Sequence, residues 1–265
     1  MITKNKIKYI NSLKLNKFRK KYVEFVVEGP KLVEELIKSD FEISQIFATK
    51  VWISENENII NGILDVITEV NDIELKKISG FSTPNKVLAI AKIPKRKIDF
   101  SKIFSDLVFV LDDIQDPGNL GTIIRTCDWF GVRNLICSKE CVDVYNPKVV
   151  QATMGSFARV NVFYVDIINF LKNLPENVSV YGATLNGTEL NKIKFSSENT
   201  VIIIGNESKG IKKNIFPFIK YKIYIPHLYS SLDADNQAES LNASVSLSII
   251  LYDFKRRFVK NKFNF

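Results

Sequence analysis

The sequence has little of what several protein classes require. Histidine occurs once, at His227, so neither a histidine-based triad nor a histidine metal cluster is expected. Cys127, Cys137 and Cys141 are odd in number and lack a zinc-like spacing, and we interpret them as reduced thiols of a cytoplasmic protein. No apolar run approaches the roughly 18 residues of a membrane span, and the first residues lack the hydrophobic core of a signal peptide. We therefore expect neither membrane insertion nor secretion.

What the sequence does contain is the balance of a folded protein with a large core. Of its 265 residues, 46% are hydrophobic and 25% are charged. This composition excludes a disordered tail, a collagen-like chain and a disulfide scaffold. The length suffices for one large domain or two ordinary ones.

Charge is concentrated at the two ends of the chain. The net charge is +8, yet residues 1–23 carry seven lysines, one arginine and no acid, and residues 254–265 carry three lysines, two arginines and no acid. Basic ends on a less basic body suggest attraction to a polyanion through its phosphates. Charge alone leaves open a merely solubilising surface.

Short β-branched and aromatic runs alternate with helical stretches along the chain, which is typical of an α/β protein. In residues 1–95 the patterns predict strands at 22–27, 43–48, 65–70 and 86–93. Helices are predicted from Pro30, which suits a first helical turn, and near 57–64 and 71–78. We expect this part to form a smaller α/β sandwich domain.

Residues 96–106 are charged and aperiodic, which predicts a linker. After it, residues 107–265 are expected to form a second α/β domain. Almost wholly apolar strands, typical of a parallel sheet, are predicted at 107–111, 134–137, 160–165, 178–183, 201–204 and 222–225. The predicted helices span 118–130, 146–153 and 240–254.

Three polar motifs follow predicted strands of this second domain, where α/β sheets bind ligands. In the first, the strand ends in acids, the chain turns at Pro117-Gly118, and a helix carries Asn119 and Arg125. These two residues are almost two helical turns apart, and we expect them on the same side. A helix cap at Asn119 and a surface charge at Arg125 would explain them equally.

The second motif is Gly205-Asn206-Glu207-Ser208-Lys209-Gly210, whose glycines would let backbone amides approach a ligand. It matches neither a Walker loop nor a Gly-x-Gly-x-x-Gly fingerprint, and a plain turn would also explain it. The third motif runs from Ile225-Pro226 to Ser240-Leu241-Asn242-Ala243-Ser244. Ser240 is the expected cap of the last helix, which leaves Asn242, a poor helix former, as a functional candidate.

In order and spacing, these motifs resemble the SpoU (TrmH) family of RNA ribose 2′-O-methyltransferases over residues 107–257. The matching residues are Asn119-x-Gly121-Thr122-Ile123-x-Arg125-Thr126, Gly205-Asn206-Glu207-x-x-Gly210, Ile225-Pro226 and Ser240-Leu241-Asn242-x-Ser244, with the family's Ala-Thr-Met-Gly-Ser signature at 152–156. Residues 25–35 resemble the substrate-binding domain that many members carry, which is similar to a small ribosomal-protein fold.

The resemblance implies a trefoil-knot (SPOUT) α/β methyltransferase domain that binds S-adenosylmethionine and needs no metal. It also implies a homodimer, with each active site using an arginine from the partner subunit. The residues that it assigns to cofactor binding are Thr184, Leu185, Gly205, Asn206, Gly210, Ile225, Leu241 and Ala243.

Five residues carry over as catalytic: Arg125, Asn119, Glu207, Ser240 and Asn242. In the family the arginine is credited with activating the ribose hydroxyl. Because a guanidinium does not readily lose a proton, we expect Arg125 instead to clamp the adjacent phosphate and stabilise the developing alkoxide. The other four would orient Arg125, the ribose and the methionine portion of the cofactor.

The expected substrate is large-subunit ribosomal RNA, with its backbone held by the basic residues 14–21. Transfer RNA is the first alternative, because it presents the same hydroxyl and phosphates. A non-catalytic RNA-binding or ribosome-assembly protein is another, and a nucleotide hydrolase would lack its phosphate loop. The 13 residues between Pro226 and Ser240 form a longer connection than the family usually has. This connection could loop into solvent or cover the cofactor pocket.

Overall fold

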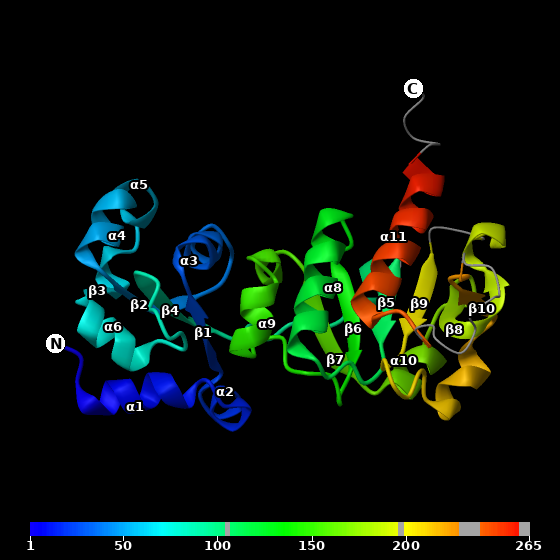
Figure 1. The fold of residues 1–265 in the computed structure, drawn as a ribbon, viewed down its shortest axis with the longest axis horizontal. Helices are drawn as coiled ribbons and strands as arrows, with labels where there is room; N and C mark the ends of the chain where they lie inside the picture. Colours follow the sequence, from blue (N-terminus) through cyan, green and yellow to red (C-terminus); the bar gives the residue numbers. More distant parts are fainter. Residues whose placement is uncertain (104–106, 196–198, 228–238, 260–265) are drawn as a thin grey trace. The chain divides into compact units, whose positions relative to one another are not determined.

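The structure is a computed structural model of the chain, and it describes residues 1–103, 107–195, 199–227 and 239–259. It divides into two compact units (Figure 1). Unit 1 consists of Met1–Arg96 together with Asp143–Arg159, and unit 2 of Lys97–Val142 with Val160–Phe265. The segment Asp143–Arg159, expected in the second domain, thus packs with the first. Among the described helices, none is long and apolar enough to cross a bilayer.

Unit 1 is built on a four-stranded sheet in the order β1-β4-β2-β3. β4 is antiparallel to both β1 and β2, and β3 is parallel to β2. Both faces of the sheet are buried: Phe25 and Val27 of β1 join one apolar cluster, and Val26 joins another. The strands are β1 (Glu24–Glu28), β2 (Ile43–Ala48), β3 (Ile67–Glu69) and β4 (Val87–Lys92).

Helices cover both faces of this sheet. Pro30 opens α3, as predicted, whereas α1, α2 and α4 were not predicted. α1 buries Ile10, but its other positions are rich in lysine, so the sequence does not show the periodic apolar pattern by which a helix is predicted. The helices of unit 1 are α1 (Lys4–Ser12), α2 (Asn16–Tyr22), α3 (Pro30–Ile37), α4 (Lys50–Glu55), α5 (Glu57–Ile60), α6 (Asp72–Ile78) and α9 (Pro147–Ala152), with single turns η1 (Leu64–Val66) and η2 (Ser156–Ala158).

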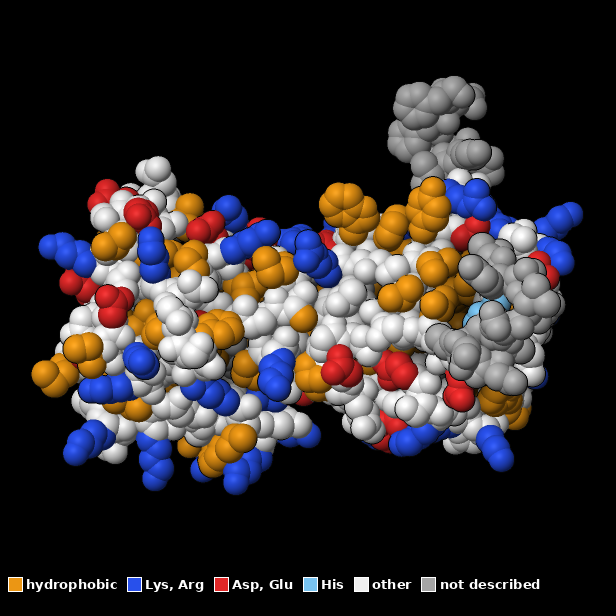
Figure 2. All heavy atoms as spheres, viewed as in Figure 1, with side chains coloured by type: hydrophobic (Ala, Val, Ile, Leu, Met, Phe, Trp, Pro, Cys, Tyr) orange, Lys and Arg blue, Asp and Glu red, His pale blue; other side chains and the backbone are white. Residues whose placement is uncertain are grey.

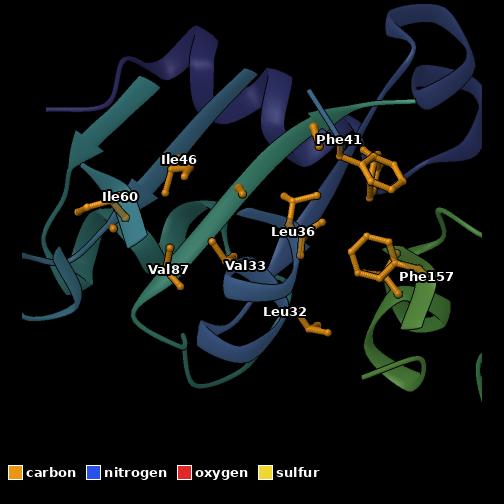
Figure 3. Packing of buried hydrophobic residues seen from close by; sticks show 14 of the residues in the cluster. Leu32, Val33, Leu36, Phe41, Ile46, Ile60, Val87 and Phe157 are labelled. Atoms are coloured by element: carbon orange, nitrogen blue, oxygen red, sulfur yellow. The ribbon is translucent and has the colours of Figure 1, made fainter. Parts of the chain in front are cut away.

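The segment Asp143–Arg159 completes the core of unit 1. Phe157 packs edge-on against Phe41, with ring centroids 5.8 Å apart, and joins the cluster drawn in Figure 3. Gln151 of α9 donates a hydrogen bond of 2.7 Å to the carbonyl oxygen of Glu28. Gly155 has φ +100°, and a Cβ there would lie 2.7 Å from Cγ of Glu35. The family's Ala-Thr-Met-Gly-Ser signature is therefore a tight turn packed against α3.

Unit 2 contains the six-stranded sheet β10-β8-β9-β5-β6-β7, and every pair in it is parallel, as predicted. β8 extends well beyond the predicted strand, with a register shift where it meets β10. The strands are β5 (Val108–Leu111), β6 (Asn134–Ser138), β7 (Asn161–Val165), β8 (Ser179–Glu189), β9 (Thr200–Ile204) and β10 (Tyr221–Tyr224).

The strand order has a switch point in the middle of this sheet, between β5 and β9. The connection after β5 leads to β6 on one side, while the connection after β9 leads to β10 on the other. Neighbouring strands whose connections diverge leave an opening at their carboxyl ends, where ligands bind. The helices are α7 (Phe100–Ile103), α8 (Pro117–Trp129), α10 (Ile167–Lys172) and α11 (Ala243–Val259), with η3 (Leu190–Lys192) and η4 (Lys213–Phe218).

Candidate active site

The first motif is positioned by the start of α8. Asp116 caps this helix by accepting a 2.8 Å hydrogen bond from the backbone N–H of Asn119. Asn119 is therefore not the cap, and its side chain is available for other contacts. Pro117 occupies the first turn, where its missing N–H is not needed.

The second motif is a closed loop after β9. A Cβ at Gly205 would lie 2.3 Å from the carbonyl carbon of Gly210, so the loop closes only with glycine at this position. Asn206 holds the turn from inside, because its Oδ1 accepts hydrogen bonds from the backbone N–H groups of Ser208 (2.9 Å) and Lys209 (3.1 Å).

The third motif begins α11, and here the predicted cap is wrong. The helix starts at Ala243 rather than at Ser240, and its cap is Asn242. Oδ1 of Asn242 accepts hydrogen bonds from the backbone N–H and the hydroxyl of Ser244, at 2.9 and 2.6 Å. Asparagine is a preferred cap because its side-chain oxygen reaches such orphan N–H groups. Ser240 is exposed.

The three motifs meet in one chain of hydrogen bonds. Nδ2 of Asn119 donates to Oε1 of Glu207 (2.5 Å), and Nδ2 of Asn242 donates to Oδ1 of Asn119 (2.9 Å). An ionised carboxylate can only accept hydrogen bonds, so the amide of Asn119 must turn its nitrogen to Glu207 and its oxygen to Asn242. The oxygen of Asn242 then faces α11. Each side chain is thus held in a single orientation.

Arg125 lies apart from this chain, contrary to the prediction that it shares a side of α8 with Asn119. Six residues at about 100° each place the two side chains about 120° apart around the helix. Arg125 is exposed and makes no hydrogen bond or ion pair within the described part of the chain.

A cavity of about 1470 Å³ opens beside the three motifs. All eight residues predicted to bind the cofactor line this cavity, together with Glu207 and Ser240. Asn119, Asn242 and Arg125 do not. Sequence reasoning missed several polar lining residues that directly adjoin the predicted strands and loops: Asn186, Lys213, Lys222, Tyr224 and His227. The long connection after Pro226 falls mostly outside the described residues, at 228–238.

Behind the second motif lies a smaller pocket of about 120 Å³, lined in part by Asp112, Glu140 and Lys212. Nζ of Lys212 is 3.2 Å from an oxygen of each carboxylate. Burial opposes its charge, but hydrogen bonds to Asp112 and Glu140 outweigh this, so the pKa of Lys212 is raised. Within the described ranges, no three His, Cys, Asp or Glu side chains are grouped as a metal site would need.

The sequence matches two family models. Residues 106–252 match the SpoU rRNA Methylase family, and residues 4–89 match the MRM3-like substrate binding domain. The chain belongs to the SpoU rRNA methylase family. This confirms the family and the enzyme class that the four motifs predicted. The parallel α/β fold with a separate N-terminal domain is confirmed as well.

Relatives of this SpoU-family protein match along nearly its whole length. The 23S rRNA (guanosine(2553)-2′-O)-methyltransferase RlmP of Bacillus subtilis is 29% identical, covering 94% of this chain and 96% of that protein. A putative TrmH-family RNA methyltransferase from Porphyromonas gingivalis has a similar structure, with a TM-score of 0.83 at 30% identity over 97% and 99% of the two chains. An AdoMet-bound rRNA methyltransferase from Sinorhizobium meliloti gives a TM-score of 0.82 at 26% identity over 98% and 97%.

Proposed function

We propose that this SpoU-family protein transfers a methyl group from S-adenosylmethionine to a ribose 2′-hydroxyl of large-subunit ribosomal RNA. The observation that carries the proposal is the hydrogen-bonded chain of Glu207, Asn119 and Asn242 beside the cavity that the second and third motifs line. Ribosomal RNA is favoured over transfer RNA by the name of the Bacillus subtilis relative, which aligns over almost all of both chains.

The cavity suits S-adenosylmethionine in its chemistry. Apolar side chains from strand ends and α11, among them Ile204, Ile223 and Ile250, offer a surface for the adenosine portion, and the loops offer backbone polar groups. This cofactor supplies an electrophilic methyl group on a positively charged sulfur. Glu207 offers a local negative charge for that cation, although Lys209, Lys213 and Lys222 also line the cavity.

The remaining catalytic task is to place and activate the ribose hydroxyl. Asn119, which is itself held by Asn242, donates to Oε1 of Glu207, and Oε2 of Glu207 makes no hydrogen bond with a described residue. We assign Oε2 the role of accepting a hydrogen bond from the substrate. Fixing reactants in a near-attack geometry lowers the barrier by roughly 7–11 kcal/mol, which makes positioning the main contribution of these residues.

A second part of the proposal is that two subunits share each active site. α8 and α11 pack together, with Oγ1 of Thr126 3.3 Å from Oγ of Ser248, and present an exposed apolar face (Figure 2). Trp129 of α8 is 84% exposed and Tyr252 of α11 59% exposed. Exposed patches of this kind mark interaction sites. The other members of this α8–α11 face are Val245 and Ile249.

Arg125 lies four residues before Trp129, on the same side of α8. If the α8–α11 face of one subunit covers that of a second, Arg125 is carried toward the partner's cavity. This arrangement explains why Arg125 is separated from the Asn119 group of its own subunit. There the guanidinium would clamp a substrate phosphate and stabilise the developing alkoxide.

Unit 1 would hold the RNA, with fewer cations than the sequence suggested. Lys17, Lys20 and Lys21 are exposed on α2. Arg19 of the same tract is only 2% exposed and pairs with Asp143, so it cannot contact phosphate. Lys14 donates to the carbonyl oxygen of Ser79, and burial lowers the pKa of its ammonium despite the opposing charge of Glu28.

The basic C-terminal end contributes less than its charge implies. Arg256 and Arg257 both pair with Asp253, and the last two lysines lie outside the described residues.

The knotted chain path and the cytoplasmic location remain predictions.

The transfer itself is tested with labelled S-adenosylmethionine and unmodified ribosomal or transfer RNA. We expect label on a ribose 2′-oxygen of ribosomal RNA, and its loss in Asn119→Ala. Label on transfer RNA instead would correct the substrate. If the cofactor binds but no RNA is labelled, a ribosome-assembly intermediate becomes the substrate to assay. Without cofactor binding, the non-catalytic alternative replaces the proposal.

Sharing of the site is tested by mixing two inactive variants. Arg125→Ala and Glu207→Gln subunits are combined after dissociation and dilution. Mixed dimers contain one site with both native residues if Arg125 acts in the partner, so activity should return. If Arg125 acts within its own subunit, each mixed-dimer site lacks one of the two residues, and no activity returns. Arg125→Ala alone should still bind S-adenosylmethionine.

A further inference from the structure

Two aspartates directly after β5 hold the loop of residues 205–212 on the side facing away from the cavity. Asp112 is completely buried, and its Oδ2 accepts a 2.8 Å hydrogen bond from the backbone N–H of Lys212. Its Oδ1 lies 3.2 Å from Nζ of the same lysine. One carboxylate thus contacts both the main chain and the side chain at the end of the loop.

Asp113 makes the second set of contacts. Its carbonyl oxygen accepts a 2.9 Å hydrogen bond from Nδ2 of Asn206, and its carboxylate lies 3.3 Å from Nζ of Lys209. Asp113 also has φ +60°, a left-handed conformation that is unfavourable for most residues other than glycine. Strained backbone of this kind persists where surrounding contacts require it, and it clusters at functional sites. Here it directs the carbonyl group toward Asn206.

The contact between Asp112 and Lys212 lies outside the cofactor cavity, whereas Asn206 and Lys209, the partners of Asp113, line it. Asp112 and Lys212 line the 120 Å³ pocket, and neither Asp112, Asp113 nor Lys212 lines the 1470 Å³ cavity. The loop between them supplies Gly205, Asn206 and Gly210 to that cavity. Any effect of Asp112 or Lys212 on a ligand in the cavity must therefore pass through the position of the loop.

We infer that Asp112 and Lys212 are positioning residues, and that the ion pair between the buried Asp112 and the half-exposed Lys212 fixes the loop of residues 205–212 in the position that S-adenosylmethionine requires. The inference rests on the proposed function, since it assigns a role toward the same cofactor. Glu140 belongs to the outer side of this pair, because its carboxylate reaches Nζ of Lys212 from an exposed position. The ion pair connects Asp112, directly after β5, to the residue that ends the loop following the neighbouring strand β9.

The inference predicts a specific kinetic pattern for Lys212→Met. Loss of the ammonium leaves Asp112 with the backbone N–H alone, so the loop can shift. A shifted loop loses backbone contacts to the cofactor. Because one or two lost hydrogen bonds weaken binding roughly 10- to 100-fold, we expect the Kd and KM for S-adenosylmethionine to rise by about that factor. The KM for RNA should stay unchanged. Lys212→Arg keeps a cation beside Asp112 and should recover most of the affinity.

Lys139→Met is the matched control, because this exposed lysine lines the same small pocket without a contact to Asp112. It should bind S-adenosylmethionine like the wild type. Lys212→Met should also melt at a lower temperature than Lys139→Met, because Asp112 is left buried without its cation. Cofactor affinity is therefore compared at a temperature where both variants are fully folded, which separates positioning from a general loss of stability. Equal cofactor affinity in Lys212→Met and the wild type would overturn the inference.

Hydrogen exchange separates this inference from the proposed function. If the wild-type protein does not bind S-adenosylmethionine, the proposed function fails. The positioning role is then judged from the ligand-free protein, where Lys212→Met should speed amide exchange in residues 206–212 and Lys139→Met should not. Unchanged exchange in Lys212→Met would reject the positioning role as well. Asp112→Asn is a second variant for the same measurements, since it removes the charge and keeps an acceptor.

Discussion

Arg19 and Asp143, which are 124 residues apart in sequence, form a buried ion pair within unit 1. Nη2 and Nε of Arg19 lie 2.6 and 2.8 Å from Oδ2 of Asp143. Nη1 of Arg19 donates to the carbonyl oxygens of Leu13 and Lys14. The guanidinium therefore joins α2, the turn before it and the segment Asp143–Arg159, and its role is structural.

Replacing Arg19 should destabilise unit 1 strongly. Arg19→Met leaves Asp143 and two carbonyl groups without their donor, and breaking such a buried pair costs about 3–5 kcal/mol. Asp143 is partly exposed, so we expect the lower end of this range. Urea unfolding checks it, with Lys20→Met as a control that should change stability by less than about 0.5 kcal/mol. If both variants unfold at the same urea concentration, the structural role is wrong.

The exposed lysines of α2 should govern the salt dependence of RNA binding. Lys17→Glu, Lys20→Glu and Lys21→Glu together should weaken binding and flatten the plot of log affinity against log salt, by about 0.7–0.9 for each phosphate that is no longer neutralised. The charge-matched control replaces three exposed lysines: Lys31 of α3, Lys38 directly after α3, and Lys50 of α4. An unchanged slope in the α2 variant would assign the RNA surface elsewhere.

Asn242 combines a cap and an active-site contact, and two substitutions can separate them. Asn242→Asp should still cap α11 but cannot donate to Asn119, so methyl transfer should fall at least about tenfold with little change in melting temperature. Asn242→Ala should lose activity and also about 1 kcal/mol of stability. Thermal melts and kcat for each variant provide the comparison. Full activity in Asn242→Asp would show that the hydrogen bond to Asn119 is dispensable.

Stability should fall in alkaline solution because of a buried thiol. Complete burial of Cys127 raises its pKa to about 12, whereas an unfolded chain releases the same proton near pH 8.5. The folded state then binds one more proton than the unfolded state between these values. Its contribution is complete below about pH 8.5, and the free energy of unfolding declines by about 1.4 kcal/mol per pH unit from there toward pH 12.

Urea unfolding between pH 8 and 10 measures this slope. Cys127→Ala should show a shallower decline than the wild type, whatever its absolute stability. Identical slopes in the two proteins would mean that Cys127 does not carry the effect.

Much of the fold was predictable because its signals are local. β2 has the predicted bounds, 43–48, and Pro30 begins a helix as expected. The parallel sheet followed from strands without polar positions, such as β9, since a strand buried on both faces cannot alternate. The cofactor loop could be located from Gly205, whose missing side chain is required by the approach of Gly210.

The caps show where local reasoning failed. Asn119, Ser240 and Asn242 are all residue types that cap helices, and the sequence distinguishes them only by their distance from the predicted start of each helix. The structure selects Asp116 and Asn242, because helix starts depend on where the preceding strand and loop deliver the chain. The prediction that Arg125 and Asn119 lie on the same side of α8 was wrong for a simpler reason: six residues are not a whole number of helical turns.

The sequence by itself therefore determined the family, the parallel sheet and the residues that line the cavity, such as those of the loop Gly205–Gly210, since each signal is carried by short stretches of sequence. Only the tertiary structure decided what the charges do. Arg19 and Lys20 are neighbours of the same sign, yet one is buried against Asp143 and the other is exposed. The role of a charged side chain depends on the partner that lies next to it in the folded protein, and that partner can be distant in the sequence.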